Sequence, residues 1–189
     1  MNNNESFGES VKDAVKFMQK IYRDIDAMMI TVEDLMVRKK FKPTEANRIS
    51  GDLGNSFDCD KWLLKSFYRI YCPETNANSA LKVGAIHILL APPEFYNEPV
   101  CLCMTAKFKT PVEFPNIWNG WRPGGSEKIL EKLVDKDGSI DFNTGEMNDI
   151  FPLAVTGSAF VVPLCSIDSE DSVKAKIVNP LLSLVEKYN

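Results

Sequence analysis

Apolar residues recur at alternating intervals of three and four along the N-terminal part of the chain. They are Val11, Ala14, Met18, Ile21, Ile25, Met28, Val32 and Leu35. This spacing places them on one side of an α-helix and predicts a helix over about residues 9–38. Further apolar residues widen the stripe, namely Val15, Tyr22, Met29 and Met36. A stripe of this width is typical of a helix that lies on a hydrophobic core.

Three segments in the middle of the chain have the composition of β-strands. Residues 65–72 are aromatic and β-favouring, although a helix is the alternative there. Residues 81–90 are apolar at successive positions, which is typical of a central strand covered on both faces. Residues 100–108 follow a proline-rich connection and are expected to return beside 81–90.

The remaining segments complete the predicted fold. Residues 110–125 are expected to be irregular because of their prolines and glycines. The other expected elements are a short helix at 126–134 capped by Ser126, strands at 139–142 and 157–167, and a helix at about 170–188. Pro163 predicts an edge or a bulge in the later strand, and Pro180 predicts a kink in the last helix.

Together the elements predict an α+β fold in one domain, residues 1–189. Its core is an antiparallel sheet of about four to five strands within about residues 61–167, packed by the long N-terminal helix and the C-terminal helix. At 1.5 Å per residue the N-terminal helix would be roughly 45 Å long, which matches or exceeds a domain diameter of roughly 40 Å.

Composition and charge narrow the classes of function. Of the 189 residues, 44% are hydrophobic and 25% are charged, which predicts a folded chain rather than a disordered one. The net charge of -4 gives no general attraction to nucleic acid or to anionic lipid, and the longest uncharged run, 151–165, is too short to span a bilayer. Five cysteines without a CxxC pair, and no visible secretory signal, favour a cytoplasmic protein with reduced thiols.

Cys101 and Cys103 lie two positions apart on a predicted strand and therefore share one face. We expect them to pack as small buried hydrophobic residues. The alternative is a Cys–His dyad with His87. Pairing Leu90 with Pro99 would put His87 opposite Leu102, on the other face, whereas a slip of one residue would put His87 on the face of the thiols, and the sequence does not decide between the two registers. No second thiol pair exists to complete a zinc site, so neither a metal nor a cofactor is expected.

Residues 116–128 are the best candidate for a small-molecule pocket. They combine Trp118, Trp121, Arg122, Gly124 and Gly125 ahead of a helix N-terminus, where free amides bind anions. His87 would be the acid or base of such a site. The simpler interpretation is a long loop held in place by its tryptophans.

The acidic residues that follow match a calcium-binding loop only in part. Asp135, Asp137, Ser139, Asp141 and Glu146 have the right spacing, but Ile140 occupies the position that requires glycine. A turn between a helix and a strand is therefore preferred.

Two hypotheses follow, and no catalytic residue is assigned. The favoured one is a non-catalytic protein-interaction or regulatory domain, and the alternative is the pocket around Trp118, Trp121 and Arg122. The length of the N-terminal helix predicts a homodimer through this helix, with contacts at Met18, Ile25, Met28 and Met29. The competing interpretation is a break near residues 30–32, after which the helix folds back onto the sheet of one monomer.

Overall fold

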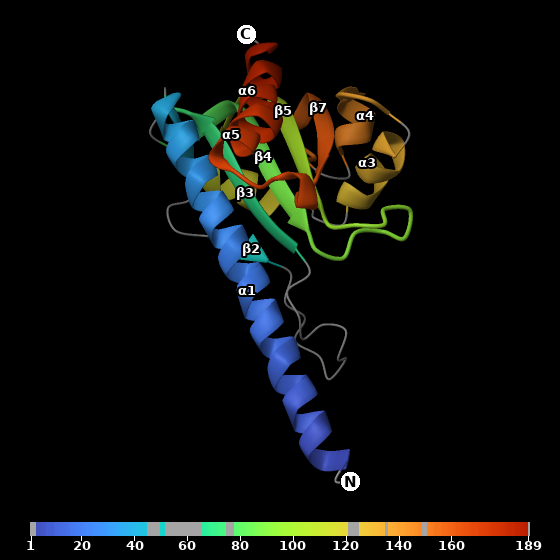
Figure 1. The fold of residues 1–189 in the computed structure, drawn as a ribbon. Coiled ribbons are helices and arrows are strands. Elements are labelled where there is room, and N and C mark those ends of the chain that lie inside the picture. Colours follow the sequence, from blue (N-terminus) through green and yellow to red (C-terminus); the bar gives the residue numbers. More distant parts are fainter. Residues whose placement is uncertain are drawn as a thin grey trace.

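The computed structural model describes residues 3–44, 50–51, 66–74, 78–120, 125–134, 136–148 and 151–188. Its first element is α1 (Asn3–Arg38), a continuous helix of 36 residues. In Figure 1 the C-terminal half of α1 lies along the body of the protein, and the N-terminal half extends away from it. The helix does not break near residues 30–32. The Thr31 hydroxyl donates to the Ala27 carbonyl at 3.0 Å, which accommodates this β-branched residue within the helix.

Seven strands form one antiparallel sheet within the described residues. They are β1 (Phe41–Pro43), β2 (Ser50–Gly51), β3 (Ser66–Pro73), β4 (Ser79–Leu89), β5 (Val100–Glu113), β6 (Ile140–Asn143) and β7 (Ala154–Pro163). Their order is β1-β3-β4-β5-β7-β6, and β2 pairs with β3 beside β1. The predicted α+β fold is confirmed. The strand number is higher than expected because β1 and β2 are too short to give a periodic signal.

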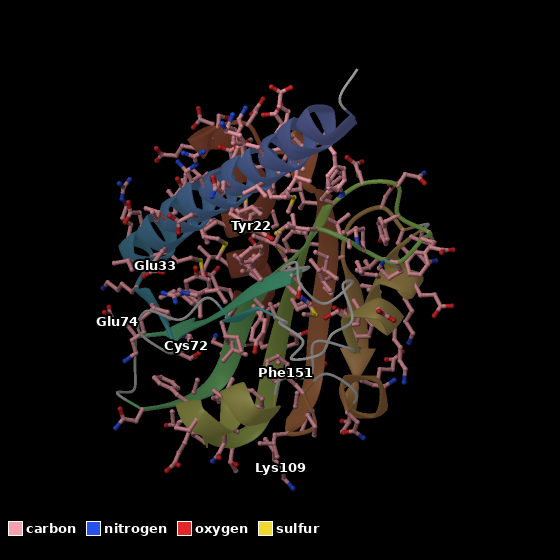
Figure 2. All side chains as sticks on the ribbon, turned by 90° about the horizontal axis from the view of Figure 1, so that it is seen from below. Tyr22, Glu33, Cys72, Glu74, Lys109 and Phe151 are labelled. Atoms are coloured by element: carbon pink, nitrogen blue, oxygen red, sulfur yellow. The ribbon has the colours of Figure 1, made fainter. Side chains whose placement is uncertain are left out.

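Helices cover both faces of this sheet. The remaining helical elements are α2 (Phe114–Gly120), α3 (Ser126–Leu133), α4 (Thr144–Met147), the 3₁₀ turn η3 (Leu164–Ser166), α5 (Glu170–Val173), the π-helical turn η4 (Lys174–Val178) and α6 (Asn179–Glu186). On one face, α1 and the C-terminal helices pack over Ile86, Ile88 and Phe160. On the other face, α2 and α3 pack over Leu102 and Met104. Figure 2 shows this layering, with Tyr22 and Glu33 on the α1 side and Phe151 on the opposite side.

The prediction that residues 110–125 are irregular is wrong for its first part. β5 continues through Pro111 to Glu113, and α2 follows directly. The pairing of β4 with β5 jumps from Lys82 and Lys107 to Ala80 and Val112. Pro111 therefore lies in a bulge, where it is not required to donate a hydrogen bond to β4.

Two other prolines lie where the regular structure ends or changes. Pro163 is the last residue of β7 and pairs with Val100 of β5, whereas β6 pairs only with residues 156–159 of β7, so Pro163 lies at an edge position in the described sheet. Pro180 lies in the first turn of α6, directly after the π-helical turn η4. Because proline removes one backbone donor and crowds the preceding turn, the chain widens into a π-helical turn there.

Candidate functional site

Cys101 and Cys103 are fully buried beneath α1 and α6, with their sulfur atoms 3.8 Å apart. The register pairs His87 with Leu102, so the imidazole lies on the opposite face of the sheet from both thiols. The packing prediction is confirmed, and the Cys–His dyad is wrong. Burial also raises the pKa of Cys103 well above its ordinary value, which opposes formation of a thiolate.

His87 is a buried residue at the contact between the sheet and α3. It is 1% exposed, its Nδ1 lies 2.9 Å from the Ser126 hydroxyl, and its ring forms a T-shaped pair with Tyr68 in which the ring centroids are 6.0 Å apart. Burial lowers the pKa of His87 to about 4, so the imidazole is neutral at pH 7. A side chain in this position connects the sheet to α3 through Ser126 and is buried from solvent.

Ser126 does not cap α3 as predicted. The N-cap residue is Gly125, which makes no side-chain cap, and Ser126 is the first residue of the helix. Its hydroxyl is buried and is used by His87 instead. The Ser126 hydroxyl therefore bonds to His87 and not to the backbone of α3, because a buried imidazole needs a hydrogen bond.

Most of the predicted pocket falls outside the described residues. Trp121, Arg122 and Gly124 are not among them, and for Trp118 only the backbone in α2 is described. Gly125 is buried at the start of α3. The small-molecule site therefore stays a prediction.

Two of the acidic residues that match the spacing of a calcium-binding loop have other partners. Asp141 receives hydrogen bonds from Lys187 at 2.6 Å and from the Ser158 hydroxyl at 2.6 Å, and these interactions lower its pKa. Glu146 accepts from the Asn143 amide at 2.9 Å and also pairs with Lys132. Asp135 lies outside the described residues. No group of three residues suited to hold a metal ion occurs in the part of the chain that the structure describes.

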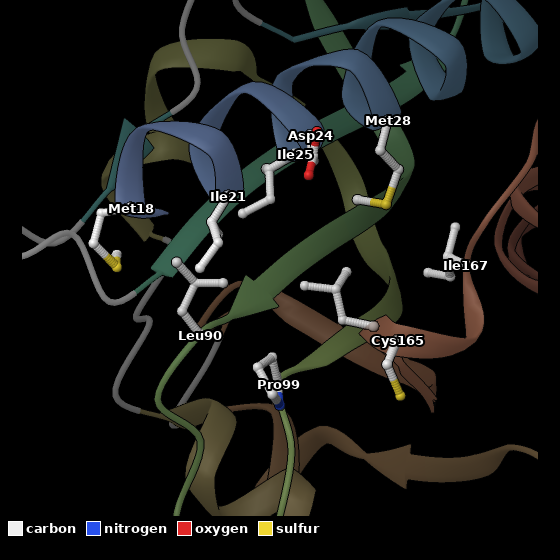
Figure 3. Close-up of a pocket in the computed structure, with 10 residues that line it drawn as sticks. Met18, Ile21, Asp24, Ile25, Met28, Leu90, Pro99, Cys165 and Ile167 are labelled. Atoms are coloured by element: carbon white, nitrogen blue, oxygen red, sulfur yellow. The ribbon is translucent and has the colours of Figure 1, made fainter. Parts of the chain in front are cut away.

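An apolar groove of about 440 Å³ lies where α1 leaves the body. One wall is the middle of α1, and the other is formed by Leu90 directly after β4, Pro99 directly before β5, and η3 with Ile167 behind it. The apolar lining consists of Met18, Ile21, Ile25, Met28, Leu90, Pro99, Leu164, Cys165 and Ile167. Asp24 supplies a carboxylate at the same groove (Figure 3).

The exposed half of α1 continues the apolar stripe beyond this groove. Every residue from Phe7 to Phe17 is exposed, and these two phenylalanines are 72% and 63% exposed. Val11 and Val15 are 47% and 51% exposed. Large apolar side chains exposed together in this way commonly mark a site of protein interaction.

The predicted dimer contacts are divided between this surface and the core. Met18 and Met28 are partly buried and line the groove. Ile25 and Met29 are each 4% exposed, so they already pack in the core of a single chain. The sequence signal that the predicted helix omitted is Phe7, which precedes Val11 by four residues and extends the same stripe.

The charged residues in the exposed N-terminal half of α1 lie on the side of the helix opposite the apolar stripe. Between Phe7 and Arg23 the charged residues are Glu9, Lys12, Asp13, Lys16, Lys20 and Arg23. At 100° per residue, all of them project from the side of α1 opposite the stripe. The apolar face of α1 is thus free of charge over this length.

Comparison with known proteins gives no further assignment. No protein-family model matches this chain, and no curated protein or solved structure shows significant similarity to it. Among the described residues, none of the helices combines the length and the apolar content needed to cross a membrane.

Proposed function

We propose that this chain is a non-catalytic protein-interaction domain of the cytoplasm, and that it binds through the N-terminal half of α1. The observation that carries the proposal is the exposed, charge-free face that runs from Phe7 to Met18. A charged face on the other side keeps the helix soluble. A helix with these properties suits recognition by another apolar surface.

The environments of the titratable side chains described above also support an interaction domain. His87 is inaccessible, and Asp141 and Glu146 are engaged by neighbouring lysines. Cys165 is exposed and carries a free thiol, which suits a reducing compartment. Its thiol donates to the Glu98 carboxylate, and this contact raises the pKa of Cys165 and disfavours the reactive thiolate.

Photo-crosslinking in the cell of origin tests this proposal. Phe17→p-benzoylphenylalanine places a crosslinker on the stripe with little change of shape, and Ile30→p-benzoylphenylalanine is the matched control. Ile30 is also exposed, at 57%, but it projects from the charged side of α1. We expect a protein adduct from position 17 and none from position 30. No adduct at position 17, or equal adducts at both positions, would contradict the proposal.

A further inference from the structure

We propose that the exposed half of α1 binds the same half of α1 in a second copy of this chain, antiparallel, with each Phe7 at the mouth of the other copy's groove. This inference rests on the proposed function and specifies the partner. The stripe recurs every seven residues, at Phe7, Ala14 and Ile21 and again at Val11, Met18 and Ile25. Such a repeat is the signature of helices that pair side by side.

The sheet and the helices packed on it allow only one relative orientation of the two α1 helices. From Ile25 to Met36 the stripe is covered by the chain's own sheet and C-terminal helices. A parallel pair joined through this face would bring the two bodies to the same place, where they would collide. An antiparallel pair puts the bodies at opposite ends and leaves only the two exposed halves in contact.

The heptad pattern allows a small set of antiparallel registers that differ by seven residues. In each of them the series Phe7, Ala14 and Ile21 faces the series Val11, Met18 and Ile25 of the second copy. The register we propose places Phe7 opposite Met18 and Val11 opposite Ala14. Phe7 is the most exposed large apolar residue of the described chain, and Met18 lines the groove. The exposed aromatic ring thus meets an apolar cavity, and two-fold symmetry repeats this contact at the other end.

Charge supports the same register at the helix ends. The N-terminus of α1 is Asn3, which this register places opposite Tyr22 of the second copy. Asp24 lies within one turn of that point, at the groove. A carboxylate beside a helix N-terminus is favourable because the unpaired amide groups there carry partial positive charge. No charged residue on the stripe between Phe7 and Ile21 opposes self-pairing.

The size of the surface indicates a weak dimer. Phe7 and Phe17 expose roughly 250 Å² of aromatic surface per copy, given that a buried phenylalanine covers about 200 Å². Val11, Val15 and the groove add to this area, so the interface approaches but does not exceed the roughly 800 Å² per partner of a standard complex. We therefore expect a dissociation constant in the micromolar range.

Analytical ultracentrifugation of the full chain between about 1 and 500 µM tests the dimer. The expected mass rises from one chain of 21.3 kDa to two chains. Val11→Asp should weaken dimerisation at least about 100-fold, because each copy would bury a charge. Ile30→Asp, an equally drastic change outside the stripe, should weaken it less than about 3-fold. Equal effects of the two substitutions would contradict the proposed surface.

A distance between spin labels tests the orientation. Nitroxides at Ile30→Cys, with Cys59 and Cys165 replaced by serine, should lie more than about 50 Å apart in the antiparallel dimer, at 1.5 Å per residue. A dimer with labels less than about 30 Å apart would overturn the antiparallel arrangement.

The mass of the adduct from position 17 separates the two proposals. An adduct of two identical chains supports both. A monomer at every concentration, with an adduct to a different protein, overturns the second copy and leaves the interaction domain. A monomer without any protein adduct overturns both.

Discussion

Acidification should destabilise the fold through His87, the only histidine of the chain. The pKa of His87 is about 4 in the folded state because the ring is buried, and it is about 6.5 in an unfolded chain. Between these values the unfolded chain binds a proton that the folded chain does not. Neutral His87 therefore contributes fully to the free energy of unfolding above pH 6.5, and this contribution is lost as the pH falls toward 4.

The two pKa values set the size of the effect. Protonation is linked to folding, and a difference of one pKa unit between the folded and unfolded states corresponds to about 1.36 kcal/mol. Between pH 7.5 and pH 5 the two pKa values of His87 therefore correspond to a loss of about 2 kcal/mol in the free energy of unfolding. Asp141 and Glu146, whose pKa values are lowered by hydrogen bonds from Lys187 and Lys132, contribute little in this window, because both are already ionised in the folded state and largely ionised in an unfolded chain above pH 5. The loss should therefore come mainly from one side chain.

Urea denaturation at both pH values measures this loss. His87→Asn retains a hydrogen-bonding group toward Ser126 but cannot be protonated, so the difference between the two pH values should largely disappear in this variant. Ser126→Ala is the control, since it removes the 2.9 Å contact and keeps the imidazole. An equal pH dependence in wild type and His87→Asn would refute the reasoning, whatever the stability of the variant at pH 7.5.

Two substitutions test how the helices are held on the sheet. Arg69 is 4% exposed and meets Glu33 of α1 at 2.5 Å, so Glu33→Gln should cost about 1–2 kcal/mol in urea denaturation, discounted for the partial exposure of Glu33. The neighbouring exposed change Asp34→Asn should cost less than about 0.5 kcal/mol, and equal costs would argue against an anchoring role. A Cβ on Gly84 would lie 3.3 Å from Leu181 of α6, so Gly84→Val should cost about 1–3 kcal/mol by overpacking and lower the melting temperature more than Gly84→Ala. A melting temperature unchanged by Gly84→Val would contradict this close approach.

Local sequence patterns predicted most of the fold. The three-and-four spacing identified α1, and the continuous apolar run identified β4 as a strand buried on both faces. The sequence allowed two registers of β4 against β5 that differ by one residue, and the register that forms is the one with His87 opposite Leu102. These features depend on periodicity, which a sequence displays directly.

Features that depend on distant partners could not be predicted in this way. Ser126 looks like a cap, and only the folded sheet brings His87 to its hydroxyl. Pro111 looks like the end of a strand, and only the bulge opposite Leu81 allows β5 to continue through it. The exposure of Phe7 and Phe17 also depends on where the body ends along α1, which the stripe does not reveal.

Hydrogen exchange along α1 tests the central claim most directly, because it reports on the binding helix itself. Amides 25–36 belong to the buried half and should be protected at every protein concentration. Residues 7–17 are exposed in a single chain and are not part of the cores formed by the described residues, and a helix of this length that is not packed on a core is marginal in water. We predict rapid exchange of amides 7–17 at about 1 µM and at least tenfold slower exchange at about 500 µM, as the second copy covers them. Exchange of these amides at one rate across this range, whether slow or fast, would contradict the account.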